Sequence, residues 1–280
     1  MRGDGHPRWR LLNTGPSDGF TNMAVDEAIL EACAAGKVSP TLRFYMWSPP
    51  ALSLGYGQPI EAAIDLARCR ALGIDIVRRP TGGRAVLHEH EVTYSVVIRE
   101  DDPRVASGVL ASYLTMSQAL MRGFSYLDIN AELLPLRRPT SLPADAESPA
   151  CFTTPSSYEV AVGGRKVVGS AQRRVHGVIL QHGSIPLSLD LEKLFSLLRP
   201  VKYASAPVTA AAEYRTRMTS LEEAGGRSYP YAEVMEALGR GFSEVWGVEL
   251  IPGRLTAEER QSCAHLRATK YGSPAWTWRR

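Results

Sequence analysis

The sequence predicts a mixed α+β fold in which mixed sheets are flanked by helices. Three observations support this class. Helical and strand-like apolar patterns alternate in the first half of the chain, a glycine pair near residue 163 separates two short strand-like runs, and the pattern is mainly helical from about residue 190 onward. The 280 residues can bury a sizeable core without disulfides or metals.

The pattern of apolar and turn residues in the first third of the chain predicts two helices with a strand between them. Thr21-Asn22 suits the cap of an amphipathic helix that carries Asp26 and Glu27 in its first turns. Residues 42–47 suit a strand that stops before two prolines. Residues 60–72 suit a helix for which Gly73 is the C-cap.

Strands are expected on both sides of a glycine turn. Residues 74–79 are strand-like and stop at Pro80, after which Gly82-Gly83 require an unusual backbone path. Residues 85–88 are strand-like again, and residues 92–98 alternate apolar and polar side chains as a half-buried strand does. The spacing of apolar residues predicts a helix over 109–124.

A hairpin is the strongest local signal of the second half. After a polar loop at 137–148, residues 158–162 and 165–168 flank Gly163-Gly164, and both positions of such a turn need the positive φ that glycine adopts easily. Lys166 would then lie opposite Ala161 and on the same face as Val168. A further helix is expected over 231–246.

Composition and charge exclude several classes of protein. Hydrophobic residues make up 44% of the chain, residues 1–10 lack a signal-peptide core, and no run approaches the ~18 apolar residues of a membrane span. We therefore expect a soluble, cytoplasmic protein that does not bind membranes. The net charge is +3 and no nucleic-acid-binding motif is present, so nucleic acid is not an expected partner.

Paired basic residues are ordinarily solvated, but several together could steer an acidic protein partner toward one face. These pairs are Arg78-Arg79, Arg137-Arg138, Arg165-Lys166, Arg173-Arg174 and Arg279-Arg280.

Four cysteines are widely spaced, without the CxxC pairs of a zinc site, so neither a metal site nor a disulfide framework is expected. Cys33 and Cys69 fall in helical apolar patterns and suit the interior, and Cys263 has no informative context. Cys151 differs, because it stands between the polar loop and the hairpin, where a side chain can face a cleft. It is the candidate nucleophile.

Lys166 has two interpretations. A lysine in a hairpin ordinarily lays its stem on apolar surface and reaches water with its ammonium group. Alternatively, the ammonium group lies in a site and stabilises a thiolate or an oxyanion. Such a cation would matter, because an unperturbed thiol with a pKa of about 8.5 is only roughly 3% ionised at pH 7. The position of Lys166 in the sequence, taken alone, favours the first interpretation, in which its ammonium group reaches water.

The segment RRPTGGRAVLH at 78–88 is neither a P-loop nor a GxGxxG motif. A strand, a glycine turn and a strand would bring backbone N–H groups close to a ligand, although the same pattern also fits an ordinary turn with solvated arginines. His88 and His182 each suit a hydrogen-bonded core histidine, and a pairing of either with Cys151 stays open.

These segments, in this order, resemble the biotin/lipoate protein ligase catalytic superfamily, and within it the cysteine-dependent octanoyltransferases. The resemblance covers nearly the whole chain. It is carried by NMAVDE at 22–27, by residues 42–56, by the segment 78–88, and by residues 150–184, with further similarity at Lys270-Tyr271 and Trp276. GRKVVGSAQ at 164–172 identifies the superfamily, and ACF at 150–152 separates the transferases from the ligases.

The resemblance implies a catalytic domain over 1–250 and a short C-terminal extension over 251–280 packed on it. It implies transfer of an octanoyl group from octanoyl-acyl carrier protein to a lysine of a lipoyl-accepting protein, either the glycine cleavage H protein or the lipoyl domains of 2-oxoacid dehydrogenases. Since one thioester is exchanged for another, no ATP and no metal would be required.

The resemblance also implies roles for single residues. Cys151 would form the acyl-thioester, and Lys166 would be the invariant lysine near the acyl carbonyl. Glu89-His90 departs from the pattern, in which an aspartate follows the histidine, and this bears on substrate detail only. The positions that match the substrate pocket are Arg79, Thr81, Gly82, Gly83, His88, Gly169 and Ser170.

Three alternatives stay open. An ATP-dependent lipoate–protein ligase on the same fold would use Lys166 and leave Cys151 without a role, so the cysteine segment speaks against it. An amidotransferase that moves the acyl group between lipoylated proteins has a different cysteine segment. A non-catalytic, acyl-carrier-binding pseudoenzyme is disfavoured because both Cys151 and Lys166 are present.

Overall fold

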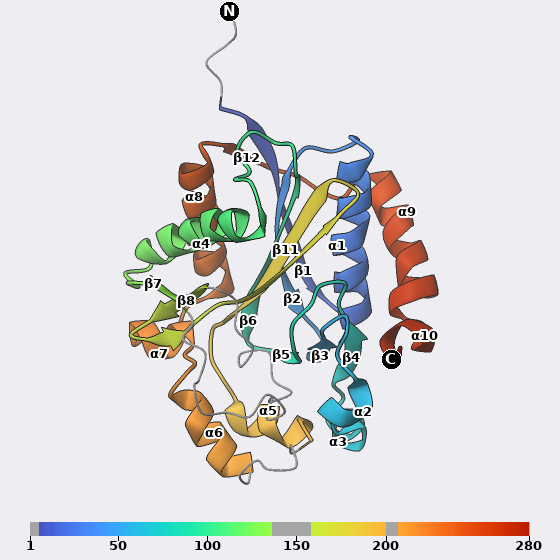
Figure 1. Cartoon of the computed structure of the whole chain (residues 1–280), viewed down its shortest axis with the longest axis vertical. Helices are drawn as coiled ribbons and strands as arrows, with labels where there is room; N and C mark the ends of the chain where they lie inside the picture. Colours follow the sequence, from blue (N-terminus) through green and yellow to red (C-terminus); the bar gives the residue numbers. More distant parts are fainter. Residues whose placement is uncertain (1–5, 136–157, 200–206, 280) are drawn as a thin grey trace, which may run out of the picture.

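The arrangement of the chain is given by a computed structural model, which describes residues 6–135, 158–199 and 207–279. Its centre is a six-stranded mixed sheet with helices on both faces, and two three-stranded sheets adjoin it (Figure 1). The predicted α+β class, with mixed sheets and flanking helices, is confirmed.

The central sheet has the strand order β10-β11-β6-β2-β1-β12. The pairs from β10 to β2 are antiparallel, whereas β1 pairs in parallel with both β2 and β12. Its strands are β1 (Arg8–Ser17), β2 (Thr41–Trp47), β6 (Glu91–Arg99), β10 (Gly169–Val175), β11 (Val178–Pro186) and β12 (Glu249–Pro252). The sequence does not predict β12, because this short strand depends on pairing with β1 at the other end of the chain.

Two layers of helices bury the two faces of this sheet. Helices α4 (Val109–Ser125) and α8 (Tyr231–Trp246) cover one face, while α1 (Gly19–Ala34) and α9 (Ala257–Leu266) lie on the other (Figure 1). The predicted helices over 109–124 and 231–246 are confirmed. Each layer packs apolar side chains against alternate residues of the strands, which is how a sheet buries both faces.

Helix α1 starts earlier than its sequence suggests. Asp18 is the N-cap, and its carboxylate accepts a hydrogen bond from the Thr21 N–H at 2.7 Å. The predicted cap at Thr21-Asn22 is therefore wrong, and Asp26 lies in the middle of the helix rather than in its first turns. This placement turns the Asp26 carboxylate toward the sheet, where it is fully buried.

Strand β6 is buried on both faces rather than half-buried as predicted. Four of its apolar residues, Val92, Tyr94, Val96 and Ile98, face α4 and α8, as the alternation indicates, whereas Val97 packs on the α1 side. The polar residues between them, Thr93 and Ser95, face α1 instead of water and hydrogen-bond to buried carboxylates. Alternation predicted the orientation correctly, but it could not reveal that the polar face is covered.

The first smaller sheet, β4-β3-β5, holds the glycine motif and consists of β3 (Ala51–Leu54), β4 (Asp75–Arg78) and β5 (Val86–His88). The helix predicted over 60–72 is split into α2 (Ile60–Ala63) and α3 (Leu66–Ala71). Ile64 is extended and bridges to Leu198, and Asp65 caps the second helix through the Arg68 N–H. Gly73 follows α3 with a φ of +63°, as predicted.

The second smaller sheet contains the predicted hairpin and comprises β7 (Glu132–Pro135), β8 (Tyr158–Val162) and β9 (Arg165–Lys166). Gly163 and Gly164 both have positive φ, and Lys166 pairs with Ala161, as predicted. The strand β9 ends at Lys166, and Gly169 then begins β10 of the central sheet. The hairpin therefore connects two sheets.

The remaining elements are mainly helical, as the pattern after residue 190 predicts. They are α5 (Leu191–Leu197), α6 (Pro207–Arg215), α7 (Leu221–Gly225), the π-helical turn η2 (Arg267–Tyr271) and α10 (Pro274–Thr277). The boundary predicted at residue 250 falls within β12, and the division of the chain there stays a prediction. In the described ranges no helix has the length and apolarity needed to span a membrane.

Helices α4 and α8 cross closely because glycines meet at the crossing. A Cβ atom added to Gly241 would lie 2.4 Å from the Ala119 carbonyl oxygen and 2.4 Å from the Gly123 nitrogen. Real Cβ atoms do not approach backbone atoms so closely. By contrast, a Cβ on Gly239, in the same helix, would meet only Leu250 Cδ1 at 3.7 Å.

We predict that Gly241→Ala lowers the free energy of unfolding by about 1–3 kcal/mol, since the helices must separate to admit the methyl group. Gly239→Ala is the matched control and should be neutral or stabilising by up to ~1 kcal/mol, because alanine favours helix. Urea unfolding of both variants measures the difference. Equal effects of the two substitutions would contradict the close crossing.

Candidate active site

A cavity lies where β3 and β5 approach β10, β11 and α1, and we call it the inner cavity. Four of the predicted pocket residues line it: Arg79, His88, Gly169 and Ser170. Apolar side chains, among them Met23, Trp47 and Val86, complete much of its wall. The space between these walls is about 350 Å³, a volume that includes solvent at the open mouth of the cavity.

Arg79 holds the glycine loop rather than reaching into solvent. Its guanidinium group is buried and donates to the backbone carbonyls of Gly82 (2.8 Å) and Arg84 (2.7 Å). It also donates to the Ser53 hydroxyl at 3.0 Å. The interpretation of this segment as a turn with solvated arginines is therefore wrong for Arg79.

The glycines of the motif lie at an exposed edge of the site and do not line the inner cavity. Gly83 has a φ of +93°, which favours glycine, but Gly82 does not have positive φ, so only one of the two needs the unusual path predicted for both. Gly55 packs so closely here that a Cβ on it would lie 1.8 Å from the Gly83 carbonyl oxygen.

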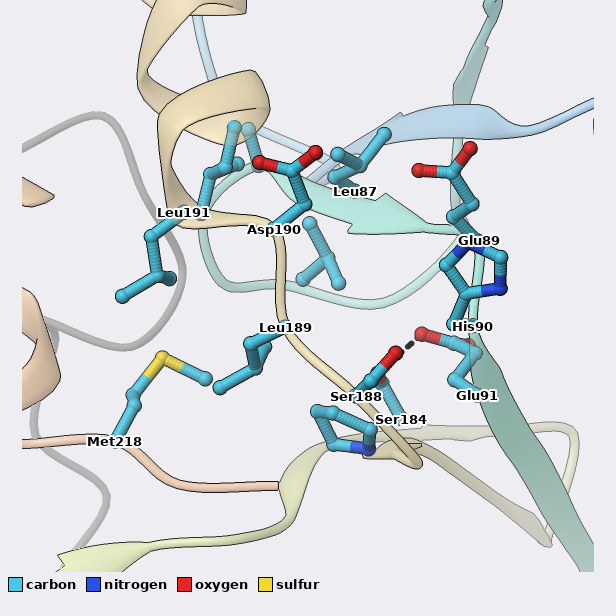
Figure 2. A pocket seen from close by; sticks show the side chains of 14 residues that line it. Leu87, Glu89, His90, Glu91, Ser184, Ser188, Leu189, Asp190, Leu191 and Met218 are labelled. Atoms are coloured by element: carbon cyan, nitrogen blue, oxygen red, sulfur yellow. Dashed lines mark hydrogen bonds between the residues drawn. The ribbon is translucent and has the colours of Figure 1, made fainter. Parts of the chain in front are cut away.

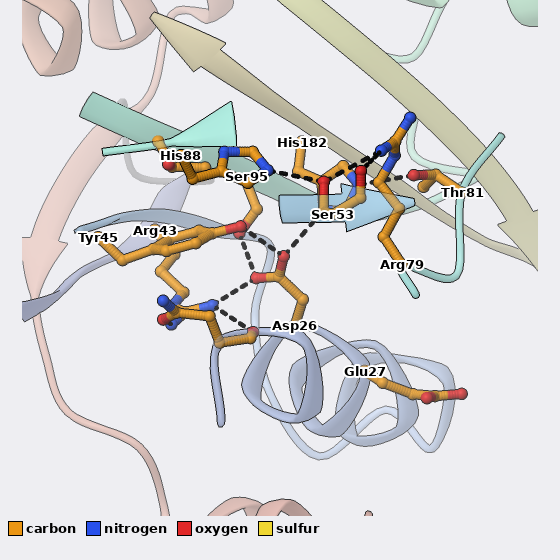
Figure 3. Close-up of polar contacts among 12 residues, drawn as sticks. Asp26, Glu27, Arg43, Tyr45, Ser53, Arg79, Thr81, His88, Ser95 and His182 are labelled. Atoms are coloured by element: carbon orange, nitrogen blue, oxygen red, sulfur yellow. Dashed lines mark hydrogen bonds and ion pairs between the residues drawn. The ribbon is translucent and has the colours of Figure 1, made fainter. Parts of the chain in front are cut away.

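A buried carboxylate, Asp26, joins helix α1 to three neighbouring strands (Figure 3). It accepts hydrogen bonds from Arg43 Nη1 at 2.6 Å, the Tyr45 hydroxyl at 3.0 Å and Ser95 Oγ at 2.8 Å. His182 Nδ1 lies 3.0 Å from its second oxygen. Its neighbour Glu27 points away from this network, toward Lys270 and Tyr271.

The pKa of Asp26 lies below its ordinary value. Burial opposes ionisation, but the Arg43 guanidinium and the hydrogen bonds from His182 and Ser95 outweigh that effect. Since an ionised carboxylate only accepts hydrogen bonds, the His182 proton is on Nδ1. Burial lowers the pKa of His182 and outweighs the opposing effect of the Asp26 carboxylate, with smaller contributions from Arg79 and His88. Nε2 of the neutral ring then accepts from the Thr81 hydroxyl at 2.7 Å.

A second relay of the same kind starts from Glu91. Its carboxylate is buried, yet its pKa is lowered because His88, Ser184 and Thr93 surround it with positive charge and hydrogen-bond donors. His88 Nδ1 lies 2.8 Å from Glu91, and Nε2 lies 2.7 Å from the Ser53 hydroxyl. His88 also stacks on Trp47, with ring centroids 4.0 Å apart. Both histidines are thus hydrogen-bonded core residues.

A second cavity adjoins the inner one and shares Val86 and Ser184 with it. Figure 2 shows its two sides: leucines and Met218 on one, and Glu89, His90 and Glu91 on the other. Glu89, at the position where the resemblance expects an aspartate, forms an ion pair with Lys193 at 2.6 Å. Glu91 lines the second cavity and accepts a hydrogen bond from Ser184, which lines both cavities.

Lys166 is buried, with 8% of its side chain exposed, and forms an ion pair with Glu159 of the same hairpin. The ordinary expectation that its ammonium group reaches water is wrong. Lys166 does not line the inner cavity, although Gly169 and Ser170, three and four residues further on, do. Cys151 lies outside the described residues, so its pairing with a histidine or with Lys166 stays a prediction.

Arg78 ties the C-terminal segment to the loop beside the site. Its buried guanidinium group donates to the carbonyls of Gly55 and Gln58, at 2.7 Å each, and to that of Thr277 at 2.9 Å. Trp276 Nε1 donates in return to the Arg78 carbonyl at 2.8 Å. The C-terminal helix α10 thus helps to fix one wall of the site.

Comparison with known proteins shows which family the chain belongs to. The family model described as the lipoyl protein ligase A/B catalytic domain matches residues 18–243. The chain belongs to this family. The match spans the inner cavity, the hairpin and most of both helical layers.

Curated relatives refine the assignment within the family. The octanoyltransferase LipM of Moorella thermoacetica is 47% identical over 272 residues, covering 97% of this chain and 98% of the relative. That of Geobacillus kaustophilus is 42% identical over 277 residues, with 97% and 98% covered. The prediction that the chain is an enzyme of the octanoyltransferase group is therefore confirmed.

Solved structures of family members share the fold. A bipartite lipoate protein ligase from Thermoplasma acidophilum superimposes with a TM-score of 0.79 at 28% identity, covering 98% of this chain and 97% of that one. A lipoate-protein ligase A bound with ATP gives 0.77 at 26% identity, with 98% of each chain covered.

Sequence reasoning missed the residues that support the site. Asp26, Glu91 and Glu159 were not predicted to have roles, and neither was Ser53. Asp26 and Glu159 do stand inside the segments that carry the family resemblance, and their acidic side chains in mainly apolar runs were the available signal. Ser53 also lies in such a segment, at 42–56, but Glu91 gave no signal, because its role depends on pairing between β3, β5 and β6. Within the described residues, no cluster of acidic, histidine or cysteine side chains is placed to hold a metal ion.

We predict that protonation of His182 destabilises this family member below pH 6.5. Because its pKa is lower in the folded state than the ordinary value of 6.5, the unfolded chain takes up the proton first as pH falls. The free energy of unfolding should then fall as the pH drops below 6.5, by up to about 1.4 kcal/mol per pH unit. Urea unfolding at several pH values should give a flatter profile for His182→Gln. An unchanged slope in that variant would contradict the assignment.

Proposed function

We propose that the protein transfers an octanoyl group from octanoyl-acyl carrier protein to a lysine of a lipoyl-accepting protein, through an acyl-thioester on Cys151. The observation that carries the proposal is the extended match to octanoyltransferases named LipM, at 42% and 47% identity over almost the whole length. The glycine cleavage H protein and the lipoyl domains of 2-oxoacid dehydrogenases are the acceptors that we infer.

The inner cavity suits a medium-length acyl chain. Burial of an octanoyl chain contributes on the order of 5 kcal/mol, at ~0.8 kcal/mol per CH₂ group. Met23, Trp47 and Val86 supply apolar surface for it. The two histidine relays hold the polar side chains of the wall, so that the cavity keeps its depth when the chain enters. A cavity of fixed depth discriminates by about 1–3 kcal/mol per methylene.

The other cysteines are poor candidates for the nucleophile. Cys33, Cys69 and Cys263 are all buried. Burial raises the pKa of each thiol, and that of Cys69 reaches about 11. A thiolate is the reactive form, so these three would be almost wholly un-ionised near neutral pH. This supports Cys151 as the nucleophile, and the family resemblance points to the same residue independently.

The proposed reaction has two steps. In the first, the Cys151 thiolate attacks the carbonyl carbon of the carrier thioester, and the carbon–sulfur bond to the carrier breaks, releasing the carrier thiolate. In the second, the amine of the acceptor lysine attacks the new thioester, loses a proton and expels the Cys151 thiolate. Lys166 would stabilise the oxyanion of each tetrahedral intermediate. Two transfers through a covalent intermediate predict ping-pong kinetics.

Neither ATP nor a metal is required for this scheme. The first step exchanges one thioester for another at little cost in free energy, and the second forms an amide from a thioester, which is favourable. We therefore propose that the enzyme works without a cofactor. The cytoplasm is the proposed location, since the carrier and acceptor are soluble proteins there.

A lipoate–protein ligase activity is the second candidate. The solved neighbours named as lipoate protein ligases share the fold at TM-scores of 0.77 and 0.79, and one was determined with ATP. Sequence identity to them is 26% and 28%, well below that to the octanoyltransferases. The relatives therefore favour the transferase.

We predict that octanoyl-acyl carrier protein, without ATP, adds one octanoyl group to the protein, as measured by intact mass. Cys151→Ala should abolish this adduct because the attacking sulfur is lost. Cys33→Ala should retain it, since that thiol is buried in the core. An adduct that persists in Cys151→Ala, or modification that strictly requires ATP, would refute the transferase scheme and favour the ligase.

A further inference from the structure

The ion pair between Lys166 and Glu159 is buried, unlike an ordinary surface ion pair. Glu159 lies two residues before Ala161, which pairs with Lys166, so both side chains project from the same face of the hairpin. The Lys166 side chain is 8% exposed and the Glu159 side chain 12%. By contrast, the neighbouring residue Arg165 forms an ion pair with Glu223 of α7 in which each side chain is 34% exposed.

The backbone of Lys166 is held from both sides. One neighbour is Ala161 of β8, and the other is the segment around Met218, with which Lys166 forms a parallel bridge. The Lys166 N–H donates to the Arg217 carbonyl at 2.8 Å, and the Lys166 carbonyl accepts from the Thr219 N–H at 2.9 Å. Both the main chain and the ammonium group of Lys166 therefore have defined partners, and the carboxylate of Glu159 contacts the ammonium group.

The two proposed steps make different demands on this pair. In thioester exchange a thiolate attacks and a thiolate leaves, so no proton has to be removed from the attacking atom. When an amine attacks, its nitrogen becomes positively charged and must lose a proton before the amide is stable. A positioned base typically contributes 10²–10⁴-fold to such a step.

We infer that Glu159 is a positioning residue for Lys166 and accepts, through Lys166, the proton released by the acceptor amine. This inference rests on the proposed function. The amine lone pair forms the new carbon–nitrogen bond, and the carbonyl π electrons move to oxygen beside the Lys166 ammonium.

The positively charged nitrogen then passes a proton to Lys166 while Lys166 passes one to Glu159. The carbon–oxygen double bond re-forms, the carbon–sulfur bond breaks and its electron pair stays on Cys151. Glu159 returns the proton to solvent. Lys166 is an ammonium group before and after, which is what stabilisation of an oxyanion requires in both steps.

The test separates the two steps by following single turnovers. Loading of the enzyme from octanoyl-acyl carrier protein is measured by intact mass, and transfer from the isolated acyl-enzyme to a lipoyl-domain lysine is measured separately. Glu159→Gln keeps the shape but cannot accept a proton. It should load within about threefold of the wild-type rate and transfer on the order of 10²-fold more slowly.

Two further variants control this result. Glu159→Asp keeps a carboxylate, so it should recover part of the lost transfer rate without altering loading. Glu223→Gln removes the charge partner of the adjacent Arg165 and should leave both steps unchanged. Normal loading by Glu159→Gln also shows that the variant is folded.

Equal slowing of both steps in Glu159→Gln would overturn the inference, since a residue that only holds Lys166 in place would affect them alike. Unchanged transfer would overturn it as well. If the wild-type protein itself failed to load without ATP, the proposed function would fall instead, and the two failures are thereby distinguished.

Discussion

The charge of Asp26, buried without access to water, is the constraint on which the rest of the structure depends. An ionised carboxylate inside a protein is tolerated only when its oxygens are fully hydrogen-bonded and a cation compensates it. Here helix α1 brings the charge, β2 supplies Arg43 and Tyr45, and β6 and β11 supply Ser95 and His182. Satisfying this single group therefore fixes the helix against three adjacent strands and sets their relative positions.

The same requirement shapes the inner cavity. Asp26 and Glu91 each orient a histidine, and each histidine binds one hydroxyl, of Thr81 or of Ser53. These hydroxyls lie beside the glycine loop, whose backbone carbonyls accept hydrogen bonds from Arg79. Polar groups that are costly to bury are thus used to build a rigid wall around an apolar space. Under the proposed function, such a wall would distinguish a flexible acyl chain by its length.

The proposed chemistry depends on a separate structural unit. The hairpin of β8 and β9 carries Lys166 and Glu159, and it connects the small sheet to β10, which lines the cavity. Solved lipoate protein ligases share the fold of this chain at TM-scores of 0.79 and 0.77, so the architecture by itself does not decide between ligase and transferase chemistry. What distinguishes them must lie in a few side chains placed on a common frame, and sequence identity to the octanoyltransferases is the discriminating observation.

Local sequence patterns were enough to predict the fold class, the hairpin register at Ala161 and Lys166, the helices α4 and α8, and the family. These follow from local patterns, from turn chemistry and from motifs that are contiguous in the chain. The folded structure was needed to show that Thr93 and Ser95 are buried and that β12 joins the sheet beside β1. It was also needed to show that Glu91, His88 and Ser53 form one relay. Each of these facts arises from contacts between segments distant in the chain, and no local pattern records which segments will meet. The Lys166 ammonium illustrates the limit, because its burial follows from how the hairpin docks, and periodicity places a side chain on a face without saying what covers that face.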